Sequence, residues 1–226
     1  MKHLIRRWLW NRGRIELRGR YRRRARALLG DAIDILGRAD IDYHLDYGTL
    51  LGIVRDGDLI PWDGDLDIGV AASEWPALEA AFAAFRARGW RVPHDDHSMA
   101  ADGPGWRAGD PRRITVVSGV MLPTSIGRIR MDVVAKYADG DQLWWVVDGN
   151  LCRAPAAYFA GRREITFAGR AARIPAEAEA YLSLIYGDWR TPRRDYVAHR
   201  DDGSALRLDP AEAGTNGTSD HQRDND

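Results

Sequence analysis

Three aspartates within five positions are the residues of this sequence best suited to chemistry. Asp63, Asp65 and Asp67 lie in the stretch PWDGDLDIGV, where apolar side chains surround them. Residues two apart on a strand point to the same face, about 6.6 Å apart along the chain. We therefore expect Asp65 and Asp67 to project together while Leu66 and Ile68 face the core. Two carboxylates placed in this way repel, and burial raises the pKa of at least one.

A divalent cation would remove this repulsion. Carboxylate oxygens suit Mg²⁺ or Mn²⁺, and Mg²⁺ is commonly held by one or two carboxylates together with substrate phosphates. Asp132, in the later strand-like run IRMDVVAK, completes the cluster if the two strands are neighbours. The predicted ligands are therefore Asp65, Asp67 and Asp132. Asp63 is either a further ligand or a residue that caps or orients the turn.

An Asp-x-Asp pair is by itself a weak signal. It also occurs on exposed turns, in calcium-binding loops and in glycosyltransferases. Calcium is disfavoured because the run lacks the glycine and the distal Glu of an EF-hand loop. A glycosyltransferase is disfavoured because the glycine turn at Gly48 would have no role in it.

Apolar periodicity predicts a mixed α/β domain around these carboxylates. Pro, Gly and Asp dominate residues 93–111, which favours a mobile loop. The stretch after the strand at 142–149, up to Ile174, is punctuated by Pro and Gly. The predicted elements are a helix from Tyr21 to Gly37, a strand at 41–45, a turn at Gly48 with a short helix, a strand at 65–70, a helix capped by Ser73 and closed by Gly89, strands at 113–120, 128–137 and 142–149, and a helix from Pro175 to Gly187.

The composition predicts one domain with attached ends. The chain has 226 residues, 45% of them hydrophobic and 29% charged, which is enough for a real core. We expect a basic segment at 1–24, a folded domain at 25–200 and a disordered acidic tail at 201–226. With no long apolar run, no secretory signal and the single Cys152, the sequence favours a cytoplasmic protein.

The net charge of zero conceals a basic N-terminus. Residues 1–30 contain Lys2 and ten arginines against the single Glu16, a balance of +10, so the other residues carry −10. Together with the tryptophans near the start, this pattern suits an anionic membrane surface, which predicts peripheral contact at the inner face of the membrane. A solvated helix that contacts nothing is the alternative. We expect no nucleic-acid partner.

Three separated motifs resemble the LicD family, the phosphocholine transferases of bacterial surface glycans, which are related to the fukutin and fukutin-related ribitol-phosphate transferases. The first is GTLLGIVR (Gly48 to Arg55) followed by IPWDGDLD (Ile60 to Asp67). The second is RMDVV, which contains Asp132, and the third is YGDWRTP (Tyr186 to Pro192). The middle of the match is weakly similar, and Gly64 stands where relatives often have an acidic or polar residue.

This resemblance implies a nucleotidyltransferase-like fold, a mixed sheet flanked by helices. It implies a phosphate-holding turn at Gly48 and Thr49 and metal-binding aspartates at Asp65, Asp67 and Asp132. The implied reaction moves a phospho-alcohol, such as phosphocholine or a phospho-polyol, from a CDP-linked donor to a glycan hydroxyl, as in the modification of lipopolysaccharide or other cell-surface glycans.

The physical chemistry of these residues agrees with the implied site. Gly48 allows the backbone to approach phosphate, and the N–H groups of the next helical turn can receive it. Arg55 can neutralise phosphate charge in the transition state, or form a surface ion pair. Asp132 can instead serve as the base for the acceptor hydroxyl. Tyr47 can stack on a cytosine or pack in the core.

Two other functions remain open at this point. A nucleotidyltransferase that adds NMP to a small-molecule or sugar acceptor would share the metal site but release pyrophosphate. A module that binds membranes or polyanions would keep the fold without the activity, and the intact aspartates argue against it.

Several further residues favour a structural role. His44 is expected in the core rather than at the site, and His94 to His97 form a poor metal cage on an irregular loop. Trp144 and Trp145 alternate on one strand, so at most one is buried on a given side. Asp188 and Trp189 are as well suited to capping the last helix as to contacting substrate.

Overall fold

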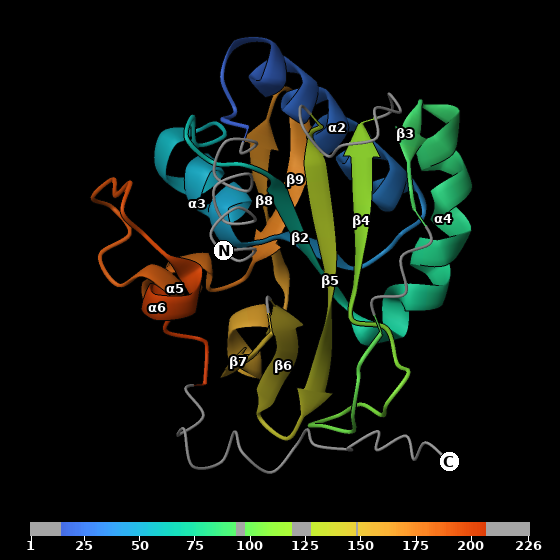
Figure 1. The fold of residues 1–226 in the computed structure, drawn as a ribbon, viewed down its shortest axis with the longest axis vertical. Helices are drawn as coiled ribbons and strands as arrows, with labels where there is room; N and C mark the ends of the chain where they lie inside the picture. Colours follow the sequence, from blue (N-terminus) through green and yellow to red (C-terminus); the bar gives the residue numbers. More distant parts are fainter. Residues whose placement is uncertain (1–14, 94–97, 119–127, 148, 207–226) are drawn as a thin grey trace, which may run out of the picture.

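The protein is described by a computed structural model covering residues 15–93, 98–118, 128–147 and 149–206 (Figure 1). Most of the basic N-terminal segment, the stretch His94 to His97 and the end of the acidic tail lie outside these residues. The described elements are α2 (Gly19–Arg38), β1 (Tyr43–Leu45), α3 (Tyr47–Asp56), β2 (Leu66–Ala71), η1 (Ala72–Glu74), α4 (Trp75–Ala87), β3 (Trp90–Arg91), β4 (Arg113–Ser118), β5 (Arg130–Asp139), β6 (Gln142–Val147), β7 (Asn150–Pro155), η2 (Ala156–Phe159), β8 (Arg162–Phe167), β9 (Arg170–Pro175), α5 (Ala178–Tyr186) and α6 (Ala198–Asp201).

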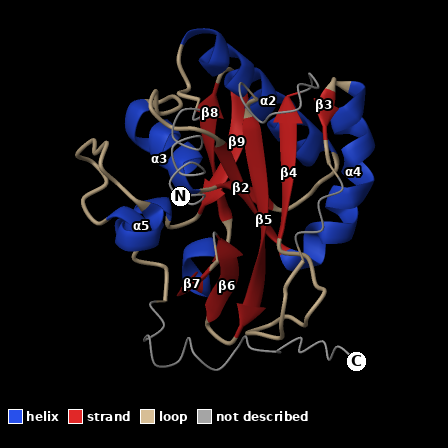
Figure 2. Cartoon of the chain, in the orientation of Figure 1, coloured by secondary structure: helices blue, strands red, loops and turns tan. Residues whose placement is uncertain are grey.

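A mixed sheet forms the centre of the described structure, which confirms the predicted mixed α/β fold. Its main path runs β1-β2-β5-β4-β3, while β6 pairs with the second half of β5 and β7 pairs with β6. The β2–β5 pair is parallel, and the neighbouring pairs are antiparallel. Figure 2 shows α4 beside β3 at one edge of the sheet, and α3 and α5 toward the opposite side.

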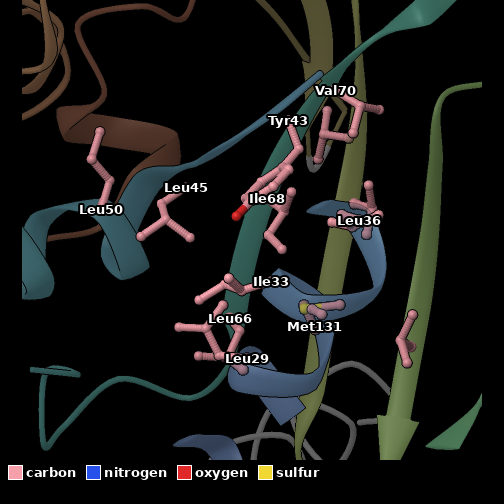
Figure 3. Packing of buried hydrophobic residues seen from close by; sticks show 14 of the residues in the cluster. Leu29, Ile33, Leu36, Tyr43, Leu45, Leu50, Leu66, Ile68, Val70 and Met131 are labelled. Carbon is pink, nitrogen blue, oxygen red and sulfur yellow. The ribbon is translucent and has the colours of Figure 1, made fainter. Parts of the chain in front are cut away.

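One face of the sheet packs on α2 and provides the core. Helix α2 has its apolar residues at the predicted spacing, and Leu29 and Leu36 are fully buried. Figure 3 shows this helix against the apolar side of the central strands. The strand residues on this side are Leu66, Ile68, Val70, Met131 and Val133, all fully buried. Because strand side chains alternate, the polar residues that lie between these apolar positions face the opposite side of the sheet.

The helix ends differ in part from the predictions. Ser73 does not cap a helix, because it lies inside the 3₁₀ turn η1 and the following helix starts at Trp75 with Glu74 as N-cap. Pro175 does not begin the last helix, since it is the final residue of β9 and α5 starts at Ala178. Gly187 does end α5, with φ +66° in the left-handed region that glycine adopts readily.

The stretch before the last helix contains strands that the sequence did not predict. Residues 150–175 form β7 and the antiparallel hairpin of β8 and β9. Arginines and alanines fill these strands, so apolar alternation is weak, and β8 has only Phe167 buried. Strand β9 lies against β1, and this contact with a distant segment is not visible in local sequence.

Residues after the predicted domain boundary at 200 pack on the domain. The N–H of Leu206 donates to the carbonyl of Leu151, and Asp202 and Ser204 are buried. At the other end, Arg22 of the basic segment pairs with Asp58. No helix among the described residues is long and apolar enough to cross a membrane.

We expect the contact between α2 and the sheet to dominate the stability of this domain. The substitution Leu29→Ala should lower the free energy of unfolding by about 2–5 kcal/mol, because it removes transfer free energy and leaves a cavity. Urea denaturation followed by circular dichroism measures the change. Arg23→Ala, at an exposed position of the same helix, should stay within about 0.5 kcal/mol of wild type. Equal stability of the two variants would contradict this account.

Candidate active site

The parallel pairing of β2 with β5 brings the predicted aspartates together. Asp67 and Asp132 are direct Cα partners across these strands, and Thr115 of β4 is the partner of Asp132 on its other side. The three side chains therefore form a row across the polar face of the sheet. Asp65 lies one residue before β2 begins and raises the pKa of Asp67 electrostatically, so it belongs to the same cluster.

The turn at the start of α3 is tied to β2 by two reciprocal hydrogen bonds. The N–H of Asp67 donates to Oγ1 of Thr49 (2.9 Å), and the N–H of Asp46 donates to the carbonyl of Asp67 (3.1 Å). Gly48 lies so close to the carboxylate of Asp63 that a Cβ atom there would overlap it. The predicted phosphate turn, Gly48 and Thr49, is therefore next to the acidic segment.

Asp63 holds the loop that leads into β2. Its Oδ1 accepts from the N–H of Gly64 (2.8 Å), and its carbonyl accepts from the N–H of Leu17 (3.1 Å). These bonds match the turn-orienting role that the sequence allowed. Its role as a metal ligand stays a prediction.

Asp67 has the most perturbed carboxyl group of the cluster. Burial raises its pKa well above the ordinary value, and the nearby carboxylates of Asp65, Asp63, Asp132 and Asp46 raise it further. Within the described part of the chain, Asp67 has no cationic partner. The repulsion anticipated from the sequence is therefore present and is concentrated on this residue.

Asp132, by contrast, is surrounded by donors. Its Oδ1 accepts from Oγ1 of Thr115 (2.6 Å), and its Oδ2 accepts from Arg113 (3.0 Å) and from Arg130 (3.2 Å). These two arginines were not among the site residues predicted from the sequence. Arg130 lies two residues before Asp132 on β5, and Arg113 lies two residues before Thr115 on β4, so each arginine shares a face of its strand with the polar residue after it. This two-residue spacing from a predicted site residue is the sequence signal that could have identified Arg130.

A second buried charge pair lies beside this row. Asp46 and Lys136 have 0% and 1% exposed side chains, and Nζ of Lys136 is 2.8 Å from Oδ2 of Asp46. Lys136 also donates to the Tyr181 hydroxyl (2.8 Å), which donates to Oδ1 of Asp46 (2.8 Å). The Lys136 ammonium faces the Trp145 ring, 3.9 Å from its centroid. Burial lowers the pKa of Lys136, and Asp46 opposes that shift.

The remaining predicted binding residues are held by protein contacts. The Tyr47 hydroxyl accepts from Nε1 of Trp145 (2.6 Å), an arrangement that suits packing better than stacking on a base. The guanidinium of Arg55 binds Asp56 and the carbonyl of Trp189, which links the first and third motifs. The phosphate contact of Arg55 stays a prediction.

His44, Trp145 and Trp189, for which a structural role was expected or allowed, are buried. His44 is buried, as expected, beside the ring of Phe159, and burial lowers its pKa so that it is neutral. Trp145 is fully buried while Trp144 is only partly so. Trp189 is buried and its Nε1 donates to Ser183, which supports a structural contact at the end of α5.

The acidic row fits a cation that arrives with phosphate better than a closed metal cage. No group of three or more His, Cys, Asp or Glu side chains in the described ranges is arranged to hold a metal ion. Asp65 and Asp67 nevertheless present hard oxygen donors, and the raised pKa of Asp67 is the repulsion that a cation would relieve. Two carboxylates completed by substrate phosphates and water is a common arrangement for Mg²⁺.

A mixed sheet with acidic strand residues facing a Gly-Thr turn defines a nucleotidyltransferase-like domain. The model of the LicD/FKTN/FKRP nucleotidyltransferase domain matches residues 40–177. The chain therefore belongs to the LicD/FKTN/FKRP family, and this membership supports a transferase.

The relatives found by sequence match short stretches. An uncharacterized protein of Rickettsia typhi, RT0683, is 35% identical over 68 residues, which are 30% of this chain and 22% of that protein. The ribitol 5-phosphate transferase FKRP of mouse and of human is 47% identical over 38 residues, 17% of this chain and 8% of FKRP. The chain thus covers less than a quarter of the length of these relatives.

Two solved structures are similar at low identity. The lincosamide antibiotic adenylyltransferase LnuA, in its lincomycin-bound form, has a TM-score of 0.44 at 15% identity. The match covers 71% of this chain and 85% of the LnuA chain. ANT(2")-Ia in complex with adenylyl-2"-tobramycin has a TM-score of 0.45 at 16% identity, with 77% and 82% covered.

The raised pKa of Asp67 predicts that replacing its carboxylate with a neutral group stabilises the fold, by an amount that depends on pH. A folded-state pKa above the unfolded value of about 3.9 means that stability falls as pH rises from about 4 toward the folded pKa. In metal-free buffer, Asp67→Asn should therefore melt at the same temperature as wild type near pH 3.5 and above it at pH 7. Each unit of pKa elevation corresponds to about 1.4 kcal/mol.

Asp139→Asn, at an exposed position at the end of β5, is the matched control and should show no such divergence. Thermal melts monitored by circular dichroism across this pH range provide the measurement. A melting temperature of Asp67→Asn below wild type at pH 7 would show that the Asp67 carboxylate is not repelled in the folded protein.

Proposed function

We propose that this protein is a Mg²⁺-dependent phosphotransferase that moves a phospho-alcohol from a CDP-linked donor to a glycan hydroxyl. The observation that carries the proposal is Asp67, whose carboxyl is destabilised by burial and by four neighbouring carboxylates. Asp46 and Asp132 beside it have fixed cationic partners. The uncompensated repulsion at Asp67, next to the start of α3 with Gly48 and Thr49, suits a metal-bound phosphate.

Asp65 and Asp67 would hold the Mg²⁺, which supplies charge stabilisation to the phosphoryl oxygens. The start of α3 would bind the phosphate. The missing side chain of Gly48 leaves room for the Asp63 carboxylate beside this turn. The Thr49 hydroxyl accepts from the Asp67 amide and keeps its own hydrogen for donation. The hydrogen bond between Thr49 and Asp67 would then connect the phosphate-binding turn to the metal ligands.

Arg113 and Arg130 provide the positive charge that phosphate transfer requires. Their side chains are 20% and 33% exposed, so solvent reaches them while they bind Asp132. Asp132 is proposed as the base for the acceptor hydroxyl or as a third metal ligand. In either role it exchanges a guanidinium for the hydroxyl or the cation, and the released arginine can bind phosphate oxygens.

The proposed chemistry is an in-line displacement at phosphorus. The acceptor oxygen forms a bond to the phosphorus that carries the alcohol, and the bond from that phosphorus to the oxygen of CMP breaks. The hydroxyl proton passes to the base, and CMP leaves with the electron pair. The glycan keeps the phospho-alcohol as a phosphodiester.

A nucleotidyltransferase reaction is the second candidate, and the family description as a nucleotidyltransferase domain favours it. The acceptor would then attack the α-phosphorus of an NTP and release pyrophosphate. The two reactions share Asp65 and Asp67 and differ in the bond that breaks. The leaving group therefore separates them. Membrane contact through residues 1–24 is a further proposal, and most of that segment lies outside the described residues.

We expect the full-length protein to release CMP, and not pyrophosphate, when it is incubated with Mg²⁺ and a panel of CDP-alcohols, NTPs and glycan acceptors. The substitution Asp65→Asn should lower turnover by at least about 1,000-fold, because a ligand of the catalytic charge is lost. Product analysis by ion-exchange chromatography measures both results. Pyrophosphate release from NTPs would select the second candidate, and wild-type turnover in Asp65→Asn would refute the metal assignment.

Arg113→Gln should raise the KM for the nucleotide donor by about 10-fold, because one charge-assisted hydrogen bond to phosphate is worth about 1.5–3 kcal/mol. Steady-state kinetics with varied donor provide the measurement. Arg163→Gln is the control, since Arg163 on β8 forms an exposed pair with Glu179 on α5 and its loss should leave KM unchanged. A donor KM unaffected by Arg113→Gln would remove this arginine from the phosphate site.

A further inference from the structure

The buried pair of Asp46 and Lys136 is costly for the fold. Two charges removed from water lose hydration energy that their attraction only partly recovers, and apolar replacements of such pairs are often neutral or stabilising. The ammonium of Lys136 is enclosed by the Trp145 ring at 3.9 Å, the Tyr181 ring at 4.8 Å and the Phe159 ring at 4.9 Å. Its buried position therefore requires an explanation other than stability.

The pair connects the elements that form the proposed phosphate site. Asp46 is the N-cap of α3, and its Oδ1 accepts from the N–H of Tyr47 (3.0 Å). Its backbone N–H binds the carbonyl of Asp67 on β2. Lys136 lies on β5, four residues after Asp132 on the same face of the strand. One ion pair thus joins the turn, the metal-ligand strand and the strand of Asp132.

The local backbone indicates that this connection holds an unfavourable conformation. Tyr47 has φ +40°, which is uncommon for a residue other than glycine. It is restrained on both sides, because its N–H binds Asp46 and its hydroxyl accepts from Trp145. Residues in such regions persist only where the surroundings determine them, and they cluster at functional sites.

We infer that Asp46 and Lys136, bridged by Tyr181, are positioning residues that fix the Gly48–Thr49 turn relative to Asp67. They do not contact substrate and act through the start of α3. The ion pair sets the distance between the phosphate-binding turn and the acidic row, at the expense of stability. The kinetic part of this inference rests on the proposed phosphotransfer, whereas its structural part does not.

The test is the double variant Asp46→Asn/Lys136→Met in the full-length protein. Asn keeps the cap bond to Tyr47, so α3 still begins at the same residue, and only the tie to β5 is cut. We expect Lys136→Met alone to lower the melting temperature by about 10 °C, because an unpaired buried charge remains. The double variant should return to the wild-type melting temperature or exceed it.

Amide hydrogen exchange by mass spectrometry separates positioning from simple packing without any substrate. We expect exchange in peptides covering 46–51 and 65–68 to be about 10-fold faster in the double variant, with no change in α4. In the CMP-release assay kcat should fall about 100-fold, the effect of about 1 Å of misplacement, with KM within about 3-fold. If wild type releases no CMP, the proposed reaction fails and the exchange pattern alone decides the inference.

Arg88→Gln is the matched control. Arg88 forms an ion pair with Asp31 between α4 and α2, away from the acidic row, so its loss should lower stability without changing exchange at 46–51 or kcat. Tyr181→Phe, which keeps the ring and removes the bridge, should give the same exchange pattern at smaller amplitude and decides the question if the double variant does not fold. Wild-type exchange at 46–51 and 65–68 in the folded variants would overturn the inference.

Discussion

The parallel pairing of β2 with β5 is the constraint on which the site depends. It makes Asp67 and Asp132 direct partners although 65 positions separate them in the chain. Neighbouring strands lie about 4.8 Å apart, so the register forces two carboxylates of the polar face together. A slip of one residue would turn these side chains to the α2 side. Leu66, Ile68, Met131 and Val133 prevent that slip, because each has a place in the core.

The structure resolves this crowding of negative charge unevenly. Arg113 and Arg130 neutralise Asp132 from the same face of the sheet, and Lys136 neutralises Asp46 from within the core. Permanent cations thus balance the outer two members of the acidic group. Asp67, between them, is left with its pKa raised. The position of greatest repulsion is therefore the position where a bound cation would be stabilised most.

Much of this arrangement could be predicted from local sequence. The apolar spacing of α2 and the alternation around Asp67 follow from chain periodicity, and both are present in the structure. The sharp turn predicted at Gly48 is instead the first turn of α3, where Tyr47 has the positive φ. The strands β7, β8 and β9 were not predicted. Arginines and alanines hide their alternation, and β9 lies against β1, an element far away along the chain.

Lys136 shows why the remaining parts of the site could not be predicted from local sequence patterns. Lys136 stands in an apolar strand run, at even spacing from Asp132, and is one of only two lysines in the chain. Its type and position were a signal, but its meaning required Asp46, 90 residues earlier, and Tyr181, 45 residues later. Local propensity describes single elements, whereas a buried charge is decided by what several elements place around it. An unexpected lysine in a core strand therefore predicts that a carboxylate partner exists without saying which one.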